Sequence, residues 1–497
     1  MNLNPINAID FYKADHRRQY PDNTQLVVSN LTPRSNKHAP QMLYWRDRIC
    51  FFGLQYFIKD FLQNAFQKGF FDKPLEDVLR RYQYRMDWSL GKGAISVEHI
   101  SALHKLGYLP IEIKALPEGT RVPVGIPVLT IHNTLPDFFW LTNYLETILS
   151  AYLWLPSTSA TMAMNYRKLF DCYAEITGID NSFCNFQGHD FSFRGMAGPQ
   201  SAVMSGAGHL LSFKGTDTLP AIDFLEEYYD AKNEIDLIGC SVPATEHSVM
   251  CMGEETNEFD TFDRLISVVY PKGIVSIVSD TWDFWQVLTD FSLRLKDKIL
   301  SRDGKVVFRP DSGDPVKIIC GDPYATPGSP EQLGAVRVLW DIFGGTHTPK
   351  GFKQLDSHVG LIYGDSITYD RASEILSRLY EAGFASSNIV LGIGSYTYQY
   401  VTRDTWGWAV KATYGTVAGE ARNISKNPKT DDGVKKSLQG LLKVYRNVHG
   451  ELKVEENCPW CDFVSHNNLL RTVYRDGSQI VTTSLHEIRD RIRQEKI

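Results

Sequence analysis

The sequence predicts an α/β fold, an irregular (β/α) barrel with a second α+β domain built from both chain ends. Three observations carry this prediction. Short β-branched runs alternate with longer amphipathic segments in the middle of the chain, polar or glycine-rich clusters follow these runs at a nearly constant spacing, and that spacing is missing from both ends. A chain of 497 residues is long enough to form both domains.

The composition excludes several classes of protein. Charged residues make up 22% and hydrophobic residues 43% of the chain, as in ordinary globular proteins. The net charge of −6 gives no strong positive field to attract nucleic acid or an anionic membrane. No apolar run reaches the roughly 18 residues of a membrane helix, and the first residues lack the pattern of a signal peptide. We therefore expect a cytoplasmic protein with neither nucleic acid nor membrane among its partners.

The two ends of the chain share a different pattern. Residues 51–62 form a compact apolar stretch, and strand-like pieces follow at 111–131. Beyond residue 400 the chain is strand-like at 408–413 and then basic and loop-like. We therefore assign residues 1–155 plus 400–497 to one discontinuous α+β domain, and residues 156–399 to the barrel.

The middle of the chain alternates strands and helices. Residues 274–279 predict a buried strand and 282–300 a helix, because apolar residues recur at helical spacing in the second segment. Residues 306–308, 359–363 and 389–391 predict further strands, and 371–382 a helix that Gly383 ends. Strand–helix–strand order implies parallel strands with helices outside them.

Polar clusters mark the ends of the predicted strands. Markers at residues 190, 217, 247, 280, 311, 365 and 394 are separated by 27, 30, 33, 31, 54 and 29 residues. One βα unit is about 30 residues long, and polar residues at carboxyl ends of strands are typical of a barrel mouth. The longer step predicts an insertion around 320–352. An open doubly wound sheet has the same local pattern and remains the alternative.

Two strand ends have the glycine pattern of an anion site. Gly364-Asp365 and the stretch 392–395, with Gly394 and Ser395, predict backbone N–H groups that converge on a phosphate. Glycine alone is weak evidence, since it often only relieves a tight turn. No P-loop motif occurs, which disfavours ordinary P-loop NTPase chemistry.

Carboxylates and cations are predicted to meet at the mouth, a mixture that suits a phosphorylated sugar. The residues are Asp190, Asp217, Asp280, Asp311, Arg194, Arg309 and His247. The alternative is that each aspartate only caps the helix after it.

Histidines and aromatic residues add chemistry. His247, beside Glu246, is a candidate acid, base or nucleophile, and His189 competes for that role. Phe191 and Tyr12 can stack on an aromatic ligand. The eight cysteines are too sparse for a disulfide framework, and Cys458 and Cys461 predict reduced thiols rather than a redox pair or half a zinc site.

Together the motifs resemble the nicotinamide phosphoribosyltransferase family of type II phosphoribosyltransferases. They run in order along nearly the whole chain: DFYK at 10–13, LPIEIKA at 109–115, WLTN at 140–143, HDF at 189–191, RG at 194–195, FKGTDT at 213–218, SVPATEHS at 241–248, VSD at 278–280, RPDSG at 309–313 and TRD at 402–404.

The resemblance implies a homodimer with active sites at the interface. Tyr12 from one subunit would then face Phe191 of the other, with the nicotinamide ring between them. Asp217 would accept a hydrogen bond from the carboxamide, and Arg309 would border the base.

The resemblance also implies phosphoribosyl pyrophosphate as the second substrate. Asp280 and Asp311 would hold ribose hydroxyls or metal-bound water, with Mg²⁺ bound through pyrophosphate and water rather than directly. ATP would phosphorylate His247 and couple its hydrolysis to turnover. The remaining phosphate contacts would come from Arg194, His247, Gly364, Asp365, Gly394, Ser395, Arg34, Arg403, Lys411 and Lys426.

Three departures from the family pattern affect these assignments. Ser395 and Tyr396 replace glycines of the second phosphate loop, Ala409 replaces a serine, and the basic loop from Lys426 to Lys436 aligns poorly. Nicotinate phosphoribosyltransferase is the nearest competing function, although Asp217 disfavours it. A non-catalytic ligand-binding protein on this fold and a barrel hydrolase with two carboxylates also stay open.

Overall fold

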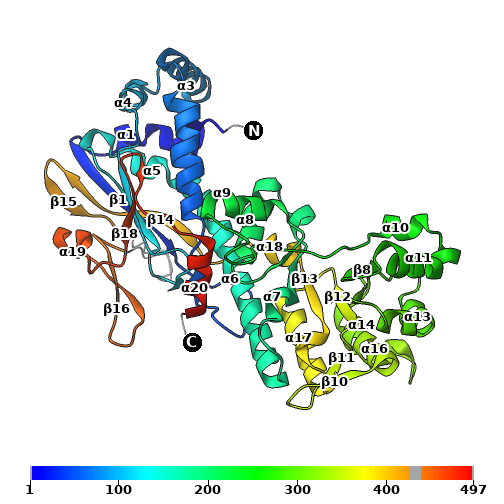
Figure 1. Cartoon of the computed structure of the whole chain (residues 1–497). Coiled ribbons are helices and arrows are strands. Elements are labelled where there is room, and N and C mark those ends of the chain that lie inside the picture. The colour runs from blue at the N-terminus through cyan, green and yellow to red at the C-terminus, as the bar shows by residue number, and fades with distance from the viewer. Residues whose placement is uncertain (1–2, 426–437, 495–497) are drawn as a thin grey trace.

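The computed structural model describes residues 3–425 and 438–494 (Figure 1). Lys426 and the basic stretch to Lys436 lie outside the described residues. In Figure 1 the strands β1 and β14 lie on the left, and the strands β8, β12 and β13 lie on the right. The chain thus has an antiparallel sheet at one end and a parallel sheet at the other.

Both chain ends build the antiparallel sheet, in which the strand order is β15-β14-β1-β5-β3-β18-β19. Its centre is the pairing of β1 with β14, which runs from Thr24 opposite Val417 to Pro33 opposite Trp408. This confirms the second α+β domain made from both ends. The strands are β1 (Thr24–Pro33), β3 (Ile111–Ala115), β5 (Leu129–Asn133), β14 (Trp408–Val417), β15 (Glu420–Asn423), β18 (Arg471–Arg475) and β19 (Ser478–Gln479).

Helices and two hairpins surround this sheet. Most of the apolar stretch at 51–62 is helical: it runs through α2 (Leu54–Tyr56) into the π-helical turn η3 (Phe57–Ala65), which η4 (Gln67–Phe71) follows, and its aromatic residues are part of the buried core. The hairpins are β2 (Arg48–Cys50) with β4 (Arg121–Pro123), and β16 (Lys443–Arg446) with β17 (Leu452–Glu455). The helices are α1 (His16–Gln19), α2 (Leu54–Tyr56), α3 (Leu75–Leu90), α4 (Glu98–Leu106), α5 (Leu141–Tyr144), α19 (Trp460–Val464) and α20 (Leu485–Gln494).

The parallel sheet has the order β7-β6-β13-β12-β9-β8. Its two edges are joined through one segment, because Cys240 bridges to Gly215 of β7 and Ala244 bridges to Ser276 of β8, both in parallel. The strands therefore follow one another around a ring in chain order, which confirms the irregular barrel rather than an open sheet. The strands are β6 (Gly188–Asp190), β7 (Gly215–Thr216), β8 (Val275–Val278), β9 (Val306–Arg309), β12 (Val359–Tyr363) and β13 (Val390–Ile393).

The helices of the barrel follow the predicted pattern. The helix expected at 371–382 is α17 (Tyr369–Glu381), and Gly383 after it has φ +77°, a conformation that favours glycine. The insertion expected around 320–352 contains α15 (Pro330–Leu333), α16 (Ala335–Phe343) and the hairpin of β10 (Gly345–His347) with β11 (Lys353–Leu355). The other helices are α7 (Cys184–Gln187), α8 (Pro199–His209), α9 (Pro220–Tyr229), α10 (His247–Met252), α11 (Glu258–Arg264), α12 (Phe284–Gln286), α13 (Ser292–Leu300), α14 (Pro315–Cys320) and α18 (Ser395–Tyr398).

The long helix α6 (Glu146–Thr177) connects the two parts, since it packs against α8 and α17 of the barrel and against β14 of the antiparallel sheet. Small residues allow this packing: a Cβ on Gly208 would lie 2.8 Å from Ala160 N. The boundary expected at residue 155 falls within α6. The assignment of residues 1–155 plus 400–497 and 156–399 to two domains remains a prediction.

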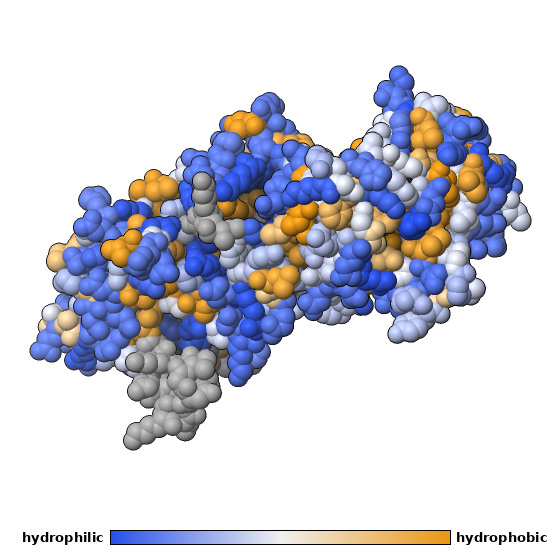
Figure 2. Space-filling view, turned by 90° about the horizontal axis from the view of Figure 1, so that it is seen from below, coloured by the Kyte–Doolittle hydropathy of each residue, from blue (hydrophilic) through white to orange (hydrophobic). Residues whose placement is uncertain are grey.

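Apolar surface is divided rather than continuous. On the face shown in Figure 2, hydrophobic residues form separate patches among hydrophilic ones. In residues 3–425 and 438–494, no helix combines the length and the apolar character needed to span a bilayer.

Candidate active site

The carboxyl ends of neighbouring strands bring His247, Asp280 and Asp311 together at the barrel mouth. His247 is the first residue of α10, after the segment 240–244 that closes the barrel. Its Nε2 lies 3.9 Å from Asp280 Oδ1 and 3.9 Å from Asp311 Oδ2, and its Nδ1 lies 3.3 Å from Thr281 Oγ1. The imidazole is half exposed, so one face of it remains accessible to a ligand.

The two carboxylate oxygens of Asp280 have different surroundings. Oδ2 accepts hydrogen bonds from Asp311 N at 2.9 Å, Ser312 N at 2.8 Å and Ser312 Oγ at 2.6 Å, which fixes the turn after β9. Oδ1 is buried and has no hydrogen-bond partner in the described part of the chain. A buried carboxylate oxygen without a partner is costly, so this atom is suited to a ligand donor or a hydrated cation.

Arg309 borders the same cluster from β9. Its guanidinium donates to Thr245 O at 2.9 Å, and its Nε lies 3.5 Å from Asp311 Oδ2. Burial raises the pKa of Asp311, because the charges of Arg309 and His247 only partly oppose it and those of Asp280 and Asp365 add to it. The carboxylate of Asp311 and the guanidinium of Arg309 therefore lie together in a partly buried place, as expected of a site for an ionic ligand.

Asp217, just after β7, is held by two neighbours on one oxygen. His189 Nε2 lies 2.8 Å from Asp217 Oδ1, and Ser241 Oγ donates to the same oxygen at 2.6 Å. Burial opposes the charge of Asp217, but these two hydrogen bonds and the charge of Arg309 lower its pKa overall. Oδ2 accepts no hydrogen bond from any residue that the structure describes, and the side chain is 44% exposed. The carboxylate of Asp217 is thus oriented and charged, and its Oδ2 is available to a ligand.

His189 and Phe191 form one wall of the mouth, with ring centroids 4.5 Å apart. Phe191 N donates to Ile393 O at 3.0 Å, and a Cβ on Gly392 would lie 2.6 Å from the Phe191 ring. Glycine at 392 therefore lets the ring lie flat against β13. His189 contacts Asp217 and therefore orients that carboxylate; which of His189 and His247 has the catalytic role stays a prediction.

The two predicted phosphate loops lie next to these residues. A Cβ on Gly364 would overlap Asp311 Oδ1, whereas a Cβ on Gly394 would meet only Phe191 O, at 4.0 Å. Arg194, on the turn η6 (Phe193–Gly195), adjoins the second loop, because a Cβ on Gly195 would lie 2.5 Å from Ser395 Cβ and Oγ. Asp365 lies close enough to influence the pKa of Asp311.

Asp190 does not have the role expected at the mouth. It is fully buried, its Oδ1 accepts from Ser192 N at 2.9 Å, and its Oδ2 accepts from Thr216 Oγ1 at 3.3 Å. Both oxygens stabilise the turn after β6, so this aspartate neither faces a ligand nor caps the following helix, whose N-cap residue is Gly198.

The other predicted phosphate ligands form a separate basic group on the antiparallel sheet. Lys13 Nζ lies 2.7 Å and Lys411 Nζ 3.9 Å from the carboxylate of Glu146. Burial lowers the pKa of Lys411; Glu146 opposes this, and the charges of Arg34, Lys13 and Arg403 add to it. Tyr12, beside Lys13 in η2 (Phe11–Asp15), is 60% exposed. Within the described residues, no hydrogen bond or ion pair connects the basic group with the barrel mouth.

The sequence analysis assigned no role to several residues that contact the predicted site residues. Ser241, Ser312 and Thr281 orient the site, and Lys13 and Glu146 anchor the basic group. Ser241 follows a strand in the same way as the marker residues, so its position was a usable signal. Cys458 is buried and Cys461 is exposed, both as free thiols.

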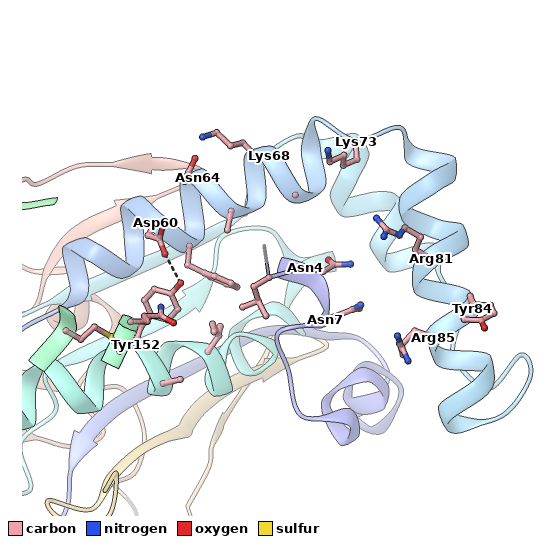
Figure 3. A pocket seen from close by; sticks show the side chains of 18 of the residues that line it. Asn4, Asn7, Asp60, Asn64, Lys68, Lys73, Arg81, Tyr84, Arg85 and Tyr152 are labelled. Atoms are coloured by element: carbon pink, nitrogen blue, oxygen red, sulfur yellow. Dashed lines mark hydrogen bonds between the residues drawn. The ribbon is translucent and has the colours of Figure 1, made fainter. Parts of the chain in front are cut away.

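A concavity outside the barrel mouth lies between α3, the π-helical turns and the N-terminus (Figure 3). It has a volume of about 1440 Å³ and is bordered by the cations Lys68, Lys73, Arg81 and Arg85. Its lining includes none of the predicted site residues.

Comparison with known proteins agrees with this geometry. Residues 186–478 match the model of the nicotinate phosphoribosyltransferase (NAPRTase) family, and residues 4–73 match that of the nicotinamide phosphoribosyltransferase N-terminal domain. The chain is 56% identical to a nicotinamide phosphoribosyltransferase of Acinetobacter baylyi over 505 residues, covering 99% of this chain and 98% of the relative. It is 33% identical to a nicotinamide phosphoribosyltransferase of Mycoplasma pneumoniae, covering 89% of this chain and 98% of the relative.

Solved structures share the fold at low sequence identity. The nicotinate-nucleotide pyrophosphorylase of Pyrococcus furiosus has a TM-score of 0.60 at 15% identity, with 100% of this chain and 96% of that chain covered. Human nicotinic acid phosphoribosyltransferase has a TM-score of 0.51 at 15% identity, with 97% and 92% covered. With a full-length relative at 56% identity and two matching family models, the chain belongs to the nicotinamide phosphoribosyltransferase family.

Proposed function

We propose that the protein transfers the phosphoribosyl group of phosphoribosyl pyrophosphate to nicotinamide, giving nicotinamide mononucleotide and pyrophosphate in NAD salvage. The observation that carries this proposal is the Asp217 carboxylate, held on Oδ1 by His189 and Ser241 with Oδ2 free beside the Phe191 wall. Full-length relatives named nicotinamide phosphoribosyltransferases support the same reaction.

The charge of Asp217 selects the base. Its free oxygen can accept a hydrogen bond from a carboxamide N–H₂, a charge-assisted bond that is stronger than a neutral one. Nicotinate would bring a second carboxylate to that oxygen, and like charges in close contact cost several kcal/mol. Because the pKa of Asp217 is lowered, this discrimination operates at neutral pH.

The cluster around Arg309 suits the sugar and its leaving group. Departure of pyrophosphate from C1 of the ribose leaves positive charge on the sugar ring and negative charge on the leaving group. Asp280 and Asp311 lie where carboxylates can hold ribose hydroxyls, Arg194 and Arg309 supply positive charge for the departing oxygens, and His247 lies beside both carboxylates to contact the pyrophosphate. The residues contribute positioning and electrostatic stabilisation rather than a nucleophile.

Mg²⁺ fits this donor set as a cofactor. Asp280 Oδ1 is buried without a partner, and Asp311 presents its carboxylate to the same space. Oxygen ligands and water are what Mg²⁺ prefers, and it would neutralise charge on the pyrophosphate when bound. We therefore assign Asp280 and Asp311 to holding metal-bound water, with no direct protein ligand.

ATP is proposed as a coupling co-substrate through His247. The half-exposed ring has Nε2 3.9 Å from a carboxylate oxygen of Asp280 and of Asp311, and a ring nitrogen can receive the terminal phosphoryl group of ATP as ADP leaves. Phosphohistidine would add negative charge next to Arg309 and Arg194. The support for this step is the position of His247 and the family resemblance.

A second copy of the chain is proposed to complete each site. The mouth holds residues for the base and ribose, while Tyr12, Arg34, Arg403 and Lys411 lie on or beside the antiparallel sheet, with no hydrogen bond or ion pair to the mouth among the described residues. A homodimer that places this basic group of one subunit over the mouth of the other would give Phe191 an aromatic partner and the phosphates their cations.

Product analysis tests the proposal. Purified protein with Mg²⁺, phosphoribosyl pyrophosphate and equal amounts of nicotinamide and nicotinic acid is analysed by mass spectrometry, with and without ATP. We expect nicotinamide mononucleotide as the dominant product. Nicotinate mononucleotide would support the nicotinate function instead and overturn the role of Asp217, and no nucleotide in either condition would favour a non-catalytic binding protein.

A further inference from the structure

A second cavity lies at the opposite end of the barrel from the mouth. Asn185, which precedes β6, and 212–214, which precede β7, line it together with parts of α6 and α20. Asp217 and the other mouth residues follow these strands, so the cavity is at the amino ends. Its volume is about 400 Å³, within the range of small-molecule sites.

Positive charge dominates the lining, with six cationic side chains and a single carboxylate, Asp171. A further carboxylate, Asp236, is shared among three of the cations, and one of these, Arg493, also pairs with Asp490 at 3.3 Å. It forms a short ion pair with Lys214, and its Oδ2 lies 2.7 Å from Arg489 NH1 and 3.6 Å from Arg493 NH2. Two negative charges, of Asp236 and Asp490, thus serve three positive ones.

Neutral groups hold the most buried cations without reducing their charge. Arg489, with a side chain only 2% exposed, donates to Leu210 O and Ile238 O, each at 2.7 Å. Arg167 bonds Asp171, but also donates to Asn185 Oδ1 and Ser212 O at 2.7 and 3.0 Å. Carbonyl and amide oxygens orient a guanidinium but do not neutralise it, and unbalanced charge in a partly buried place is unfavourable.

Two polar groups remain available to a ligand. Lys168 has no carboxylate partner among the described residues; its ammonium lies 5.9 Å from the centre of the Tyr44 ring. Ser212 Oγ is buried without a hydrogen-bond partner in that part of the chain. Apolar side chains complete the lining, namely Trp45, Met164, Leu211, Phe213 and Ile492.

We propose that this cavity binds a phosphate monoester of nucleoside monophosphate size. The phosphate would supply the missing negative charge between Lys168, Lys214 and Arg493, and Ser212 would be within the same polar end. The apolar side chains would receive the non-phosphate part of the ligand. The site is separate from the mouth, and it does not depend on the transfer reaction.

Calorimetric titration with AMP tests the proposal, with adenosine as the probe that lacks phosphate. We expect AMP to bind the full-length protein and adenosine not to bind. Lys168→Gln should weaken AMP binding at least tenfold, and adding Arg493→Gln should weaken it further. Arg309→Gln in the mouth and Lys92→Gln on an exposed loop should leave AMP binding unchanged.

The outcomes are distinct. AMP binding that is lost in Arg309→Gln but retained in Lys168→Gln would place AMP in the mouth and overturn the proposal. Equal binding of AMP and adenosine, or no AMP binding at all, would also overturn it. Because Lys168 has no carboxylate partner among the described residues, its neutralisation should leave the melting temperature and the phosphoribosyl transfer unchanged, which separates loss of the site from loss of the fold.

Discussion

Asp217 illustrates how a single residue is prepared for recognition. Two donors occupy one carboxylate oxygen, which fixes the plane of the group and leaves the other oxygen for a ligand. A free aspartate in water would have to lose its hydration and its rotational freedom on binding, whereas this one has already lost part of both.

Replacing Asp217 by Asn removes the charge but keeps the shape. We expect the ratio of kcat/KM for nicotinamide to that for nicotinate to fall at least tenfold, because the repulsion of nicotinate disappears and the bond to the carboxamide weakens. Steady-state kinetics with both bases measure the ratio. A ratio equal to that of the unchanged protein would remove Asp217 from base selection.

His247 is the residue on which ATP coupling would depend. His247→Ala should abolish the stimulation by ATP while lowering the basal transfer less, because the ring contributes to the leaving-group charge but is not a nucleophile for the ribose. Initial rates with and without ATP give both effects, and radiolabelled ATP reports phosphorylation. A His247→Ala protein that ATP still stimulates fully would exclude this role.

At the scale of elements, the C-terminal helix α20 is attached to the barrel mainly through Arg489. Its guanidinium reaches the carbonyls of Leu210, Leu237 and Ile238 and the carboxylate of Asp236. No periodicity in the sequence distinguishes this arginine from its neighbours Arg491 and Arg493, because its partners are backbone atoms far away in the chain.

Arg489→Ala should destabilise the protein by about 3 to 5 kcal/mol, since it leaves several buried carbonyls unpaired and removes one of the three cations around Asp236. We expect a lower melting temperature and faster proteolysis of α20. Arg493→Ala, in which the replaced side chain is 54% exposed, is the matched control and should have a much smaller effect. Similar melting temperatures for the two variants would show that α20 is held by its apolar face instead.

Helix α11 begins with a buried acid. Burial, with the charges of Asp283 and Glu255, raises the pKa of Glu258 from 4.5 to about 7, and its Oε1 has no hydrogen-bond partner within the described residues. The folded protein keeps this group protonated at pH values where the unfolded chain ionises it. Stability is therefore lost as the pH rises from about 4.5 through 7.

Glu258→Gln removes this ionisation while keeping the shape. We expect the variant to be more stable than the unchanged protein above pH 7, by roughly 1 to 2 kcal/mol, and the difference to vanish near pH 4.5. Thermal unfolding across this pH range measures it, with Asp260→Asn on the exposed face of α11 as control. A constant difference at all pH values would mean that Glu258 does not titrate.

The strands and the mouth were predictable because βα units have a regular length and because parallel strands place their carboxyl ends together. Asp217, His247, Asp280 and Asp311 follow from that spacing alone. The role of Asp190 in stabilising the turn after β6 did not, because a turn-stabilising aspartate and a ligand-binding aspartate have the same position in the sequence. The bond of His189 to Asp217 joins two different βα units, and no local pattern encodes which side chains meet across a barrel.

At the scale of the whole molecule, the residues expected to bind one substrate are divided between two sheets. The barrel mouth and the basic group around Glu146 are each built from residues close in space, yet neither contains the complete set. A monomer would leave Tyr12 exposed and the cations Arg34 and Lys411 without a phosphate. The proposed dimer resolves this, and it predicts that every active site uses two chains.

Mixing two inactive variants tests that prediction. Asp311→Ala damages the mouth and Lys411→Ala damages the basic group, so each homodimer has two defective sites. Co-expressed with different tags, half of the dimers would be mixed, and each mixed dimer would have one intact site and one with both defects. Activity should then return to about one quarter of that of the unchanged protein. If the mouth and the basic group of the same chain formed each site, every site would carry one defect, and mixing would restore nothing.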